Sequence, residues 1–306
     1  SFSIFSNLRR LTVWTMHSMN PLLIPLLCNT KADTQAGDII VNATGTVRVG
    51  EESRIANVVD TSTLGNAGDI RITASSLFLS DNAKLRTTTF GQGNGGNLLI
   101  EAADRVSLDR DAAIFAEVKG TGNGGNIRIN TASFSATNGA GLSNSIYGKG
   151  NAGDIFINAS GRISLDRDTA IFTEIEGTGN GGNIEITTGS LSITGGAQLL
   201  TNTVGRGSAG NIIINARDGV SFDGTTRSGR FPSTAFNSVN TESNFTGKGG
   251  NITVYTNLFR IIDGATIDAR TLNSSDASNI TREHPSLAKT SNSKCSVEVS
   301  TTNRKY

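Results

Sequence analysis

A short glycine-asparagine phrase recurs along most of the chain and constrains its fold more than any other feature. Its last glycine, just before an Asp or Asn, falls at positions 37, 68, 96, 125, 153, 182, 210 and 250, so the intervals are 31, 28, 29, 28, 29, 28 and 40 residues. Residues 97–126 also match residues 154–183 at most positions, as expected if a two-repeat unit had been duplicated. Such a period is typical of a solenoid, in which each repeat packs only on its neighbours.

Each repeat alternates apolar and polar residues with the period of two that is typical of half-buried strands. Ile127 with Ile129, Val106 with Leu108, and Ile114 illustrate the inward positions of a first, a second and a third strand. A helical solenoid would need apolar residues at i, i+3, i+4 and i+7, which the alternation contradicts. The pattern therefore predicts an all-β fold, a right-handed parallel β-helix of about eight coils of 28–29 residues with three short strands per coil.

Three regions follow from the extent of the repeat. Residues 36–270 are predicted to form the β-helix, and the 40-residue interval predicts a loop insertion near 227–237. Residues 1–35 are expected to be an irregular N-terminal segment, a cap over the first coil or a weak export signal, because arginines precede an interrupted apolar stretch. Residues 271–306 form a polar C-terminal tail, and no uninterrupted apolar run predicts a transmembrane span.

Composition argues against several classes of function. The 27 basic and 26 acidic residues are interspersed and give a net charge of +1, so no basic patch favours nucleic-acid binding. The 2 histidines and 2 cysteines lie outside the regular region, and Cys28 and Cys295 have no metal-binding or redox spacing. We expect no metal and no cofactor, and the sequence alone cannot argue a disulfide between these cysteines.

Polar residues are predicted to stack in columns at two turns of the coil. Asp or Asn opens the first strand of each repeat, and the stacked side chains are expected to form a hydrogen-bonded ladder. The members of this ladder are Asp69, Asn97, Asn126, Asp154, Asn183, Asn211 and Asn251. The turn before the third strand contains Asp109 with Asp111 and Asp166 with Asp168, where other repeats have Gly, Asn or Thr, so turn geometry explains these carboxylates.

The outward face of the third strand is the candidate binding surface. If Ile114 and its counterparts point inward, alternation turns Phe115, Glu117, Phe172 and Glu174 outward. The glutamates would lie two coils apart, about 9.6 Å at the backbone, while inverting glycosidases separate their carboxylates by about 6.5–9.5 Å. The pattern places no basic residue nearby. We interpret these residues as a solvated charged face with exposed aromatics; glycan contact and glycan cleavage are the alternatives.

The repeated G-N-[AG]-G-[DN]-I phrase, followed by L-x-[IL]-x-x-G-A-x-[IL], resembles the large filamentous-haemagglutinin-like exoproteins common in cyanobacteria. The resemblance covers roughly residues 36–270, and its motif builds coils and does not mark a functional site. It implies export through an outer-membrane transporter of the two-partner secretion route and a secreted or cell-surface location. The family's N-terminal secretion domain is not recognisable, so we expect an internal or C-terminal piece of such a protein.

The sequence thus predicts a structural or adhesive repeat segment of a secreted or surface-displayed bacterial exoprotein. We expect it to be non-catalytic and to contact a surface glycan or protein. The alternative from another class is a carbohydrate-active β-helix enzyme, a hydrolase or lyase that uses outward-facing carboxylates. A third interpretation is a non-functional fragment of a decayed gene.

Overall fold

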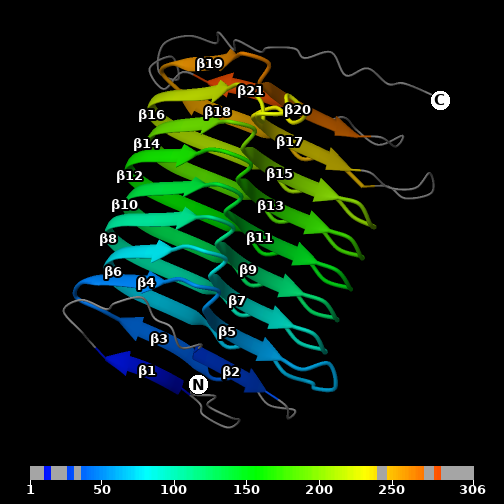
Figure 1. The fold of residues 1–306 in the computed structure, drawn as a ribbon. Helices are drawn as coiled ribbons and strands as arrows, with labels where there is room; N and C mark the ends of the chain where they lie inside the picture. The colour runs from blue at the N-terminus through cyan, green and yellow to red at the C-terminus, as the bar shows by residue number, and fades with distance from the viewer. Residues whose placement is uncertain (1–9, 15–25, 31–35, 240–246, 272–278, 284–306) are drawn as a thin grey trace.

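The computed structural model describes residues 10–14, 26–30, 36–239, 247–271 and 279–283. The regular elements of these residues are all β-strands. The chain winds in stacked coils around one interior and forms a right-handed parallel β-helix of about eight turns (Figure 1). The predicted fold class is confirmed.

Two parallel sheets form the walls of this β-helix. The strands of the larger sheet are β1 (Arg10–Trp14), β3 (Asp38–Asn42), β4 (Thr46–Val49), β6 (Ile70–Leu79), β8 (Leu98–Asp109), β10 (Ile127–Thr137), β12 (Ile155–Leu165), β14 (Ile184–Thr194), β16 (Ile212–Asp223), β18 (Ile252–Thr256), β19 (Phe259–Ile262) and β21 (Ile280–Glu283). Those of the smaller sheet are β2 (Leu26–Thr30), β5 (Arg54–Val59), β7 (Lys84–Thr89), β9 (Ala113–Val118), β11 (Gly141–Ile146), β13 (Ala170–Ile175), β15 (Gln198–Thr203), β17 (Thr234–Val239) and β20 (Thr266–Thr271).

Strand order within each sheet follows the order of the coils. The twelve-stranded sheet runs β1-β3-β6-β8-β10-β12-β14-β16-β18-β21, with β4 beside β6 and β19 beside β16. The nine-stranded sheet runs β2-β5-β7-β9-β11-β13-β15-β17-β20. Figure 1 shows the two stacks rising together from the N-terminal to the C-terminal end, so each coil contributes one layer to both sheets.

The first two predicted strands of a repeat run together in the central coils. β10 continues without interruption from Ile127 to Thr137, and its register with β12 shifts between Thr131 and Phe134. The prediction of three short strands per coil therefore differs from the structure, because the polar residues between the two apolar pairs bend the strand without ending it. The two strands stay separate only at the ends of the described β-helix, as β3 with β4 and β18 with β19.

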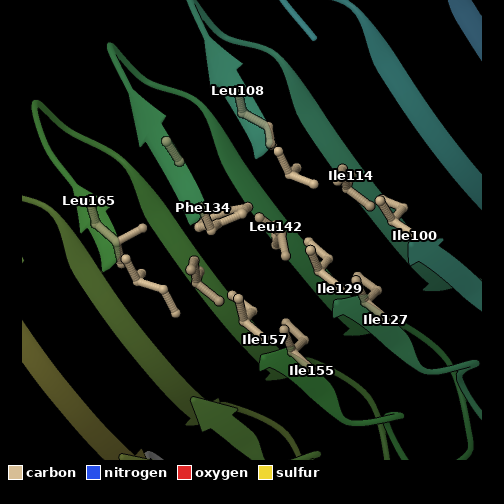
Figure 2. Close-up of a cluster of buried hydrophobic side chains, with 14 of the residues drawn as sticks. Ile100, Leu108, Ile114, Ile127, Ile129, Phe134, Leu142, Ile155, Ile157 and Leu165 are labelled. Atoms are coloured by element: carbon tan, nitrogen blue, oxygen red, sulfur yellow. The ribbon is translucent and has the colours of Figure 1, made fainter. Parts of the chain in front are cut away.

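Aliphatic side chains fill the interior in rows along the axis. Ile127, Ile155 and Ile184 are register partners in successive coils, and each is 0% exposed. Figure 2 shows Phe134 and Leu142 pointing into the same interior from the two walls of one coil. Burying one such side chain stabilises the fold by about 1.5–3 kcal/mol. Because the cluster extends from Ile39 to Ala269, the described coils share one core.

The glycine phrase forms a corner where successive coils approach each other closely. A Cβ atom added to Gly125 would lie 2.0 Å from the carbonyl oxygen of Gly96, and one added to Gly153 would lie 2.2 Å from that of Gly125. No side-chain atom fits at such distances. This close approach of backbone to backbone explains why the phrase contains glycine in repeat after repeat.

Strand stacking extends beyond the predicted limits of residues 36–270. At the N-terminal end, β1 pairs with β3 and β2, which contains Cys28, pairs with β5. At the other end, β21 pairs with β18. The remainder of the predicted N-terminal segment and polar tail, including Cys295, lies outside the described residues. No helix within the described ranges is long and apolar enough to cross a membrane.

The loop insertion begins and ends earlier than the predicted range of 227–237. Thr225 and Pro232 form an antiparallel bridge at its base, and Thr234–Val239 is the strand β17. Ala235 and Val239 are fully buried, so these residues complete the wall of the coil. Because residues from Thr234 onwards belong to the strand, the projecting loop is shorter than the predicted range.

Candidate binding face of the nine-stranded sheet

The predicted polar ladder is present at the corner that opens the larger sheet, with main-chain amides as the principal donors. The amide of Asn126 donates to Oδ1 of Asn97 at 2.9 Å, and that of Asp154 donates to Oδ1 of Asn126 at 2.8 Å. Asp69 accepts two bonds, from the main-chain and side-chain nitrogens of Asn97. The same contact links the remaining predicted members, Asn183, Asn211 and Asn251. These residues stabilise the stacking of coils.

A second ladder, which was missed in the sequence analysis, runs beside the first. The amide of Asn123 donates to Oδ1 of Asn94 at 2.8 Å, and that of Asn151 donates to Oδ1 of Asn123 at 2.9 Å. The asparagine that recurs in the middle of the glycine phrase was the available signal. This asparagine recurs for the same reason as the members of the first ladder, because its side-chain oxygen accepts a hydrogen bond from a main-chain amide of the next coil.

The carboxylates of the turn column lie at tight corners, as turn geometry predicts. Asp111 and Asp168 have left-handed φ angles of 58° and 60°. Arg110 forms an ion pair with Asp81 in the neighbouring coil, and its hydrogen bond lowers the pKa of Asp81 to about 2. A hollow of about 780 Å³ lies along this edge and includes Asp166 in its lining. The described residues contain no group of three or more His, Cys, Asp or Glu placed to hold a metal ion.

The four predicted contact residues lie on the outer face of the nine-stranded sheet. Phe115 and Glu117 are partly exposed, whereas Ala116 between them is fully buried, so the strand alternates as predicted. Phe172 and Glu174 have the same alternation in β13. The structure therefore brings all four residues onto one face, two coils apart in pairs.

A strand with small side chains separates these pairs. Ser143 is the register partner of both Phe115 and Phe172, and Ser145 is the partner of both Glu117 and Glu174. The serines are only 1% and 0% exposed, because the larger side chains of the coils on either side cover them. We call these two serines and their four register partners the serine notch.

Hydroxyl groups form a chain along the floor of the serine notch. Oγ of Ser143 lies 3.0 Å from Oγ of Ser145, and Ser145 is also hydrogen-bonded to the side chain of Tyr147. Tyr147 is 38% exposed and lies at the open end of this chain. Since the two serines are covered, Tyr147 is the member of this chain that can meet a ligand.

Burial favours the protonated form of the two glutamates of the serine notch. It raises the pKa of Glu117 above its ordinary value, while Lys119 and Arg86 act in the opposite direction. Burial also raises the pKa of Glu174, and the nearby carboxylate of Glu176 raises it further. These carboxyl groups hold a proton more readily than exposed glutamates do.

The expectation that no basic residue lies near the four predicted contact residues is wrong. Arg86 is the register partner of Phe115, and it is close enough to Glu117 for each to influence the pKa of the other. Lys84, on the same strand, places its ammonium 5.6 Å from the centre of the Phe115 ring. The alternation that identified Phe115 as outward also identifies Arg86 and Lys84 when it is continued one coil towards the N-terminus.

The aromatic rings of this face differ in how they are covered. Lys84 lies over Phe115, and the guanidinium of Arg270 lies 4.9 Å from the centre of the Phe236 ring. Among the described residues, no cation lies over the ring of Phe172. Phe172 is therefore the ring of the serine notch that is most available for stacking.

These features define a repeat-type parallel β-solenoid whose coils present continuous outer faces. No protein-family model, curated protein or solved structure matches the chain.

Proposed function

We propose that this chain is a rigid rod segment of a secreted or surface-displayed bacterial exoprotein, with a structural and adhesive role and without catalysis. The observation that carries the proposal is the single continuous core, which spans the described coils and holds them in parallel register. Equivalent outward residues then repeat at about 4.8 Å along the axis. A rod of this kind suits repeated weak contacts with a polymer or a cell surface.

The repeat motif supports export. Its resemblance to filamentous-haemagglutinin-like exoproteins supports passage through an outer-membrane transporter of the two-partner secretion route. A mainly aliphatic core and two hydrogen-bonded ladders link the successive coils, as a long secreted rod requires.

The serine notch is the proposed adhesive surface, and a glycan is the proposed ligand. A sugar has a weakly polar C–H face and a rim of hydroxyl groups. Phe172 offers a ring for the first, while Glu117, Glu174 and the hydroxyl of Tyr147 offer hydrogen bonds for the second. This mixture of an aromatic surface and a few positioned polar groups is typical of small-molecule recognition.

Glycan binding by purified protein tests this surface. On a glycan array, we expect the Phe172→Ser variant to bind the recognised glycans several-fold to about tenfold more weakly than the wild type, because stacking is lost. Phe156→Ser is the matched control, because Phe156 is a partly exposed outward residue of the same coil on the other sheet. An array without bound glycans, or an equal loss in both variants, would contradict the proposal.

Glycan cleavage is the second candidate function. It is favoured by the alignment of Glu117 and Glu174 on opposite sides of Ser145 and by the raised pKa of both carboxyl groups. Oligosaccharides incubated with the wild type and with a Glu117→Gln, Glu174→Gln double variant distinguish the two functions. We expect no cleavage by either protein; cleavage by the wild type that disappears in the double variant would establish the enzyme.

A further inference from the structure

Three cations gather on the binding face next to the serine notch. Arg54 and Lys84 are register partners in β5 and β7, and Arg86 lies two residues further along β7 on the same outward side. The register of β5 and β7 brings these three side chains together on one face. Burial is the main cause of the lowered pKa of Lys84 and of Arg86, and Arg54 lowers both further. We call these three residues the cation cluster.

The charges of the cation cluster are poorly compensated within the part of the chain that the structure describes. Neither Arg54 nor Arg86 forms an ion pair there, and the ammonium of Lys84 donates to the main-chain carbonyl of Asp111 at 2.6 Å. Burial is the main cause of the lowered pKa of Arg86. Glu117 acts to raise the pKa of Arg86 and Asp111 acts to raise that of Lys84, but neither carboxylate forms an ion pair with the cluster in the described ranges. An anionic ligand would therefore add to the compensation of these partly buried charges.

Two polar atoms at the same place have no hydrogen-bond partner among the described residues. One is Nε of Arg86, and the other is Oγ1 of Thr88, the next outward residue of the strand. Thr88 is only 1% exposed although it lies on the outward side of β7. Buried polar groups nearly always have a partner, and each one without a partner costs about 1–3 kcal/mol. Both atoms lie beneath the surface next to the cluster of positive charge, so the outer part of the Arg86 guanidinium is the part of this group that a ligand can reach.

The donors of the cation cluster fit an oxyanion. A guanidinium presents parallel N–H groups that match the two oxygens of a carboxylate or sulfate, and the second arginine and the lysine add attraction. We propose that the cation cluster binds the carboxylate or sulfate group of an acidic polysaccharide. This inference rests on the proposed adhesive function and names its ligand class.

The register of the sheet argues for a polymer that lies along the rod. Arg86, Phe115, Ser143 and Phe172 are successive partners in one outward column. A chain of sugars aligned with the axis would therefore meet the cation cluster first and the serine notch next. Glu117, one coil from Arg86, and Glu174, three coils from it, confine the positive surface to the three residues of the cation cluster, which is too short for the continuous phosphate backbone of a nucleic acid.

Binding to immobilised polymers tests the inference. The probes are polygalacturonate and dextran sulfate as acidic polymers, dextran as a neutral polymer, and duplex DNA as a non-carbohydrate polyanion. We expect the wild type to bind the acidic polysaccharides more tightly than dextran or DNA, with an affinity that falls as salt is added. Arg86→Gln should weaken this binding about tenfold or more, as expected for the loss of a hydrogen bond to a charged group.

Two further variants make the experiment decisive. Arg71→Gln is the control, because Arg71 is an exposed, outward arginine of the preceding strand on the other sheet, and it should bind like the wild type. Arg54→Glu changes an exposed residue of the cation cluster, so it tests the site even if Arg86→Gln unfolds, and it should also reduce acidic binding.

The outcomes separate this inference from the function on which it rests. Acidic binding that is equal in Arg54→Glu, Arg86→Gln and Arg71→Gln would overturn the inference and leave the adhesive face intact. Binding to dextran alone would do the same. Equal affinity for DNA and dextran sulfate would overturn the assignment to a polysaccharide. A protein that binds no glycan at all would contradict the adhesive function itself.

Discussion

Single residues of this chain are constrained by the short distances between successive coils. Gly125 has no space for a Cβ atom, because the carbonyl oxygen of Gly96 would lie 2.0 Å from it. Asn97 and Asn126 instead fill a position where a side-chain oxygen reaches the next main-chain amide. Both constraints repeat in each coil, so they leave a periodic trace in the sequence.

Glu117, in contrast, does not stabilise the stacked coils, because burial disfavours its ionised form. Its pKa is raised in the folded state, so ionisation at neutral pH destabilises the fold. We expect Glu117→Gln to be more stable than the wild type at about pH 7. The difference should shrink as the pH falls through the folded pKa and should disappear below about pH 4.5, where the unfolded carboxyl is also protonated.

Urea unfolding over a range of pH measures this effect. Glu185→Gln is the control, because Glu185 is a partly exposed outward residue on the twelve-stranded sheet. If Glu117→Gln changed the unfolding free energy by the same amount at every pH, the effect would come from altered packing, and the argument from charge would fail.

At the scale of the elements, buried polar residues attach the strands of the smaller sheet to the glycine corners. Nδ2 of Asn144 donates to the carbonyl of Gly125 at 2.6 Å, and Oδ1 of Asn144 accepts from the amide of Gly153 at 3.3 Å. In the following coil, the hydroxyl of Thr173 donates to the carbonyl of Gly182 at 2.7 Å. An inward asparagine or threonine therefore satisfies corner groups that the interior would otherwise leave unpaired.

Replacing this asparagine shows how much the attachment stabilises the strand. Asn144→Ala leaves a buried carbonyl and a buried amide without partners, and we expect it to lower the unfolding free energy by about 2–4 kcal/mol. Asn144→Thr should recover part of this loss, because Thr87 and Thr173, at the same position of other coils, donate to the glycine carbonyl nine residues ahead. Asn158→Ala, which changes an outward asparagine, should cost less than about 1 kcal/mol. Denaturant unfolding measures all three variants.

If Asn144→Ala lowered the unfolding free energy no more than Asn158→Ala, the bonds from Asn144 to Gly125 and Gly153 would contribute nothing to stability, and the argument from these bonds would fail.

Across the whole molecule, each coil packs mainly on its two neighbours. Phe134, which is 1% exposed, is the register partner of Val106 in the preceding coil and of Ile163 in the following one. The stability of a solenoid is approximately a sum of such neighbouring terms. A defect in one coil should therefore affect nearby coils more than distant ones.

Phe134→Ala tests this locality. We expect it to reduce stability by about 3–5 kcal/mol, as for other large cavities in a core. Hydrogen exchange should accelerate most in β8, β10 and β12 and least in β3 and β18. Phe78→Ala, which changes an outward phenylalanine, should leave exchange nearly unchanged. Equal acceleration in all strands would show that the rod unfolds as one cooperative unit.

The sequence by itself determined the coil: its period, its parallel strands, their inward residues, the polar ladder and the outward position of Phe115, Glu117, Phe172 and Glu174. These features depend on alternation and turn geometry, which act over a few residues and recur in every repeat. Only the tertiary structure decided that two predicted strands merge, that Asn144 is bound to a glycine corner, and that Ser143 and Ser145 are covered by their neighbours. Those outcomes depend on the register and distance between coils, because side chains far apart in the sequence become neighbours only when the coils are stacked.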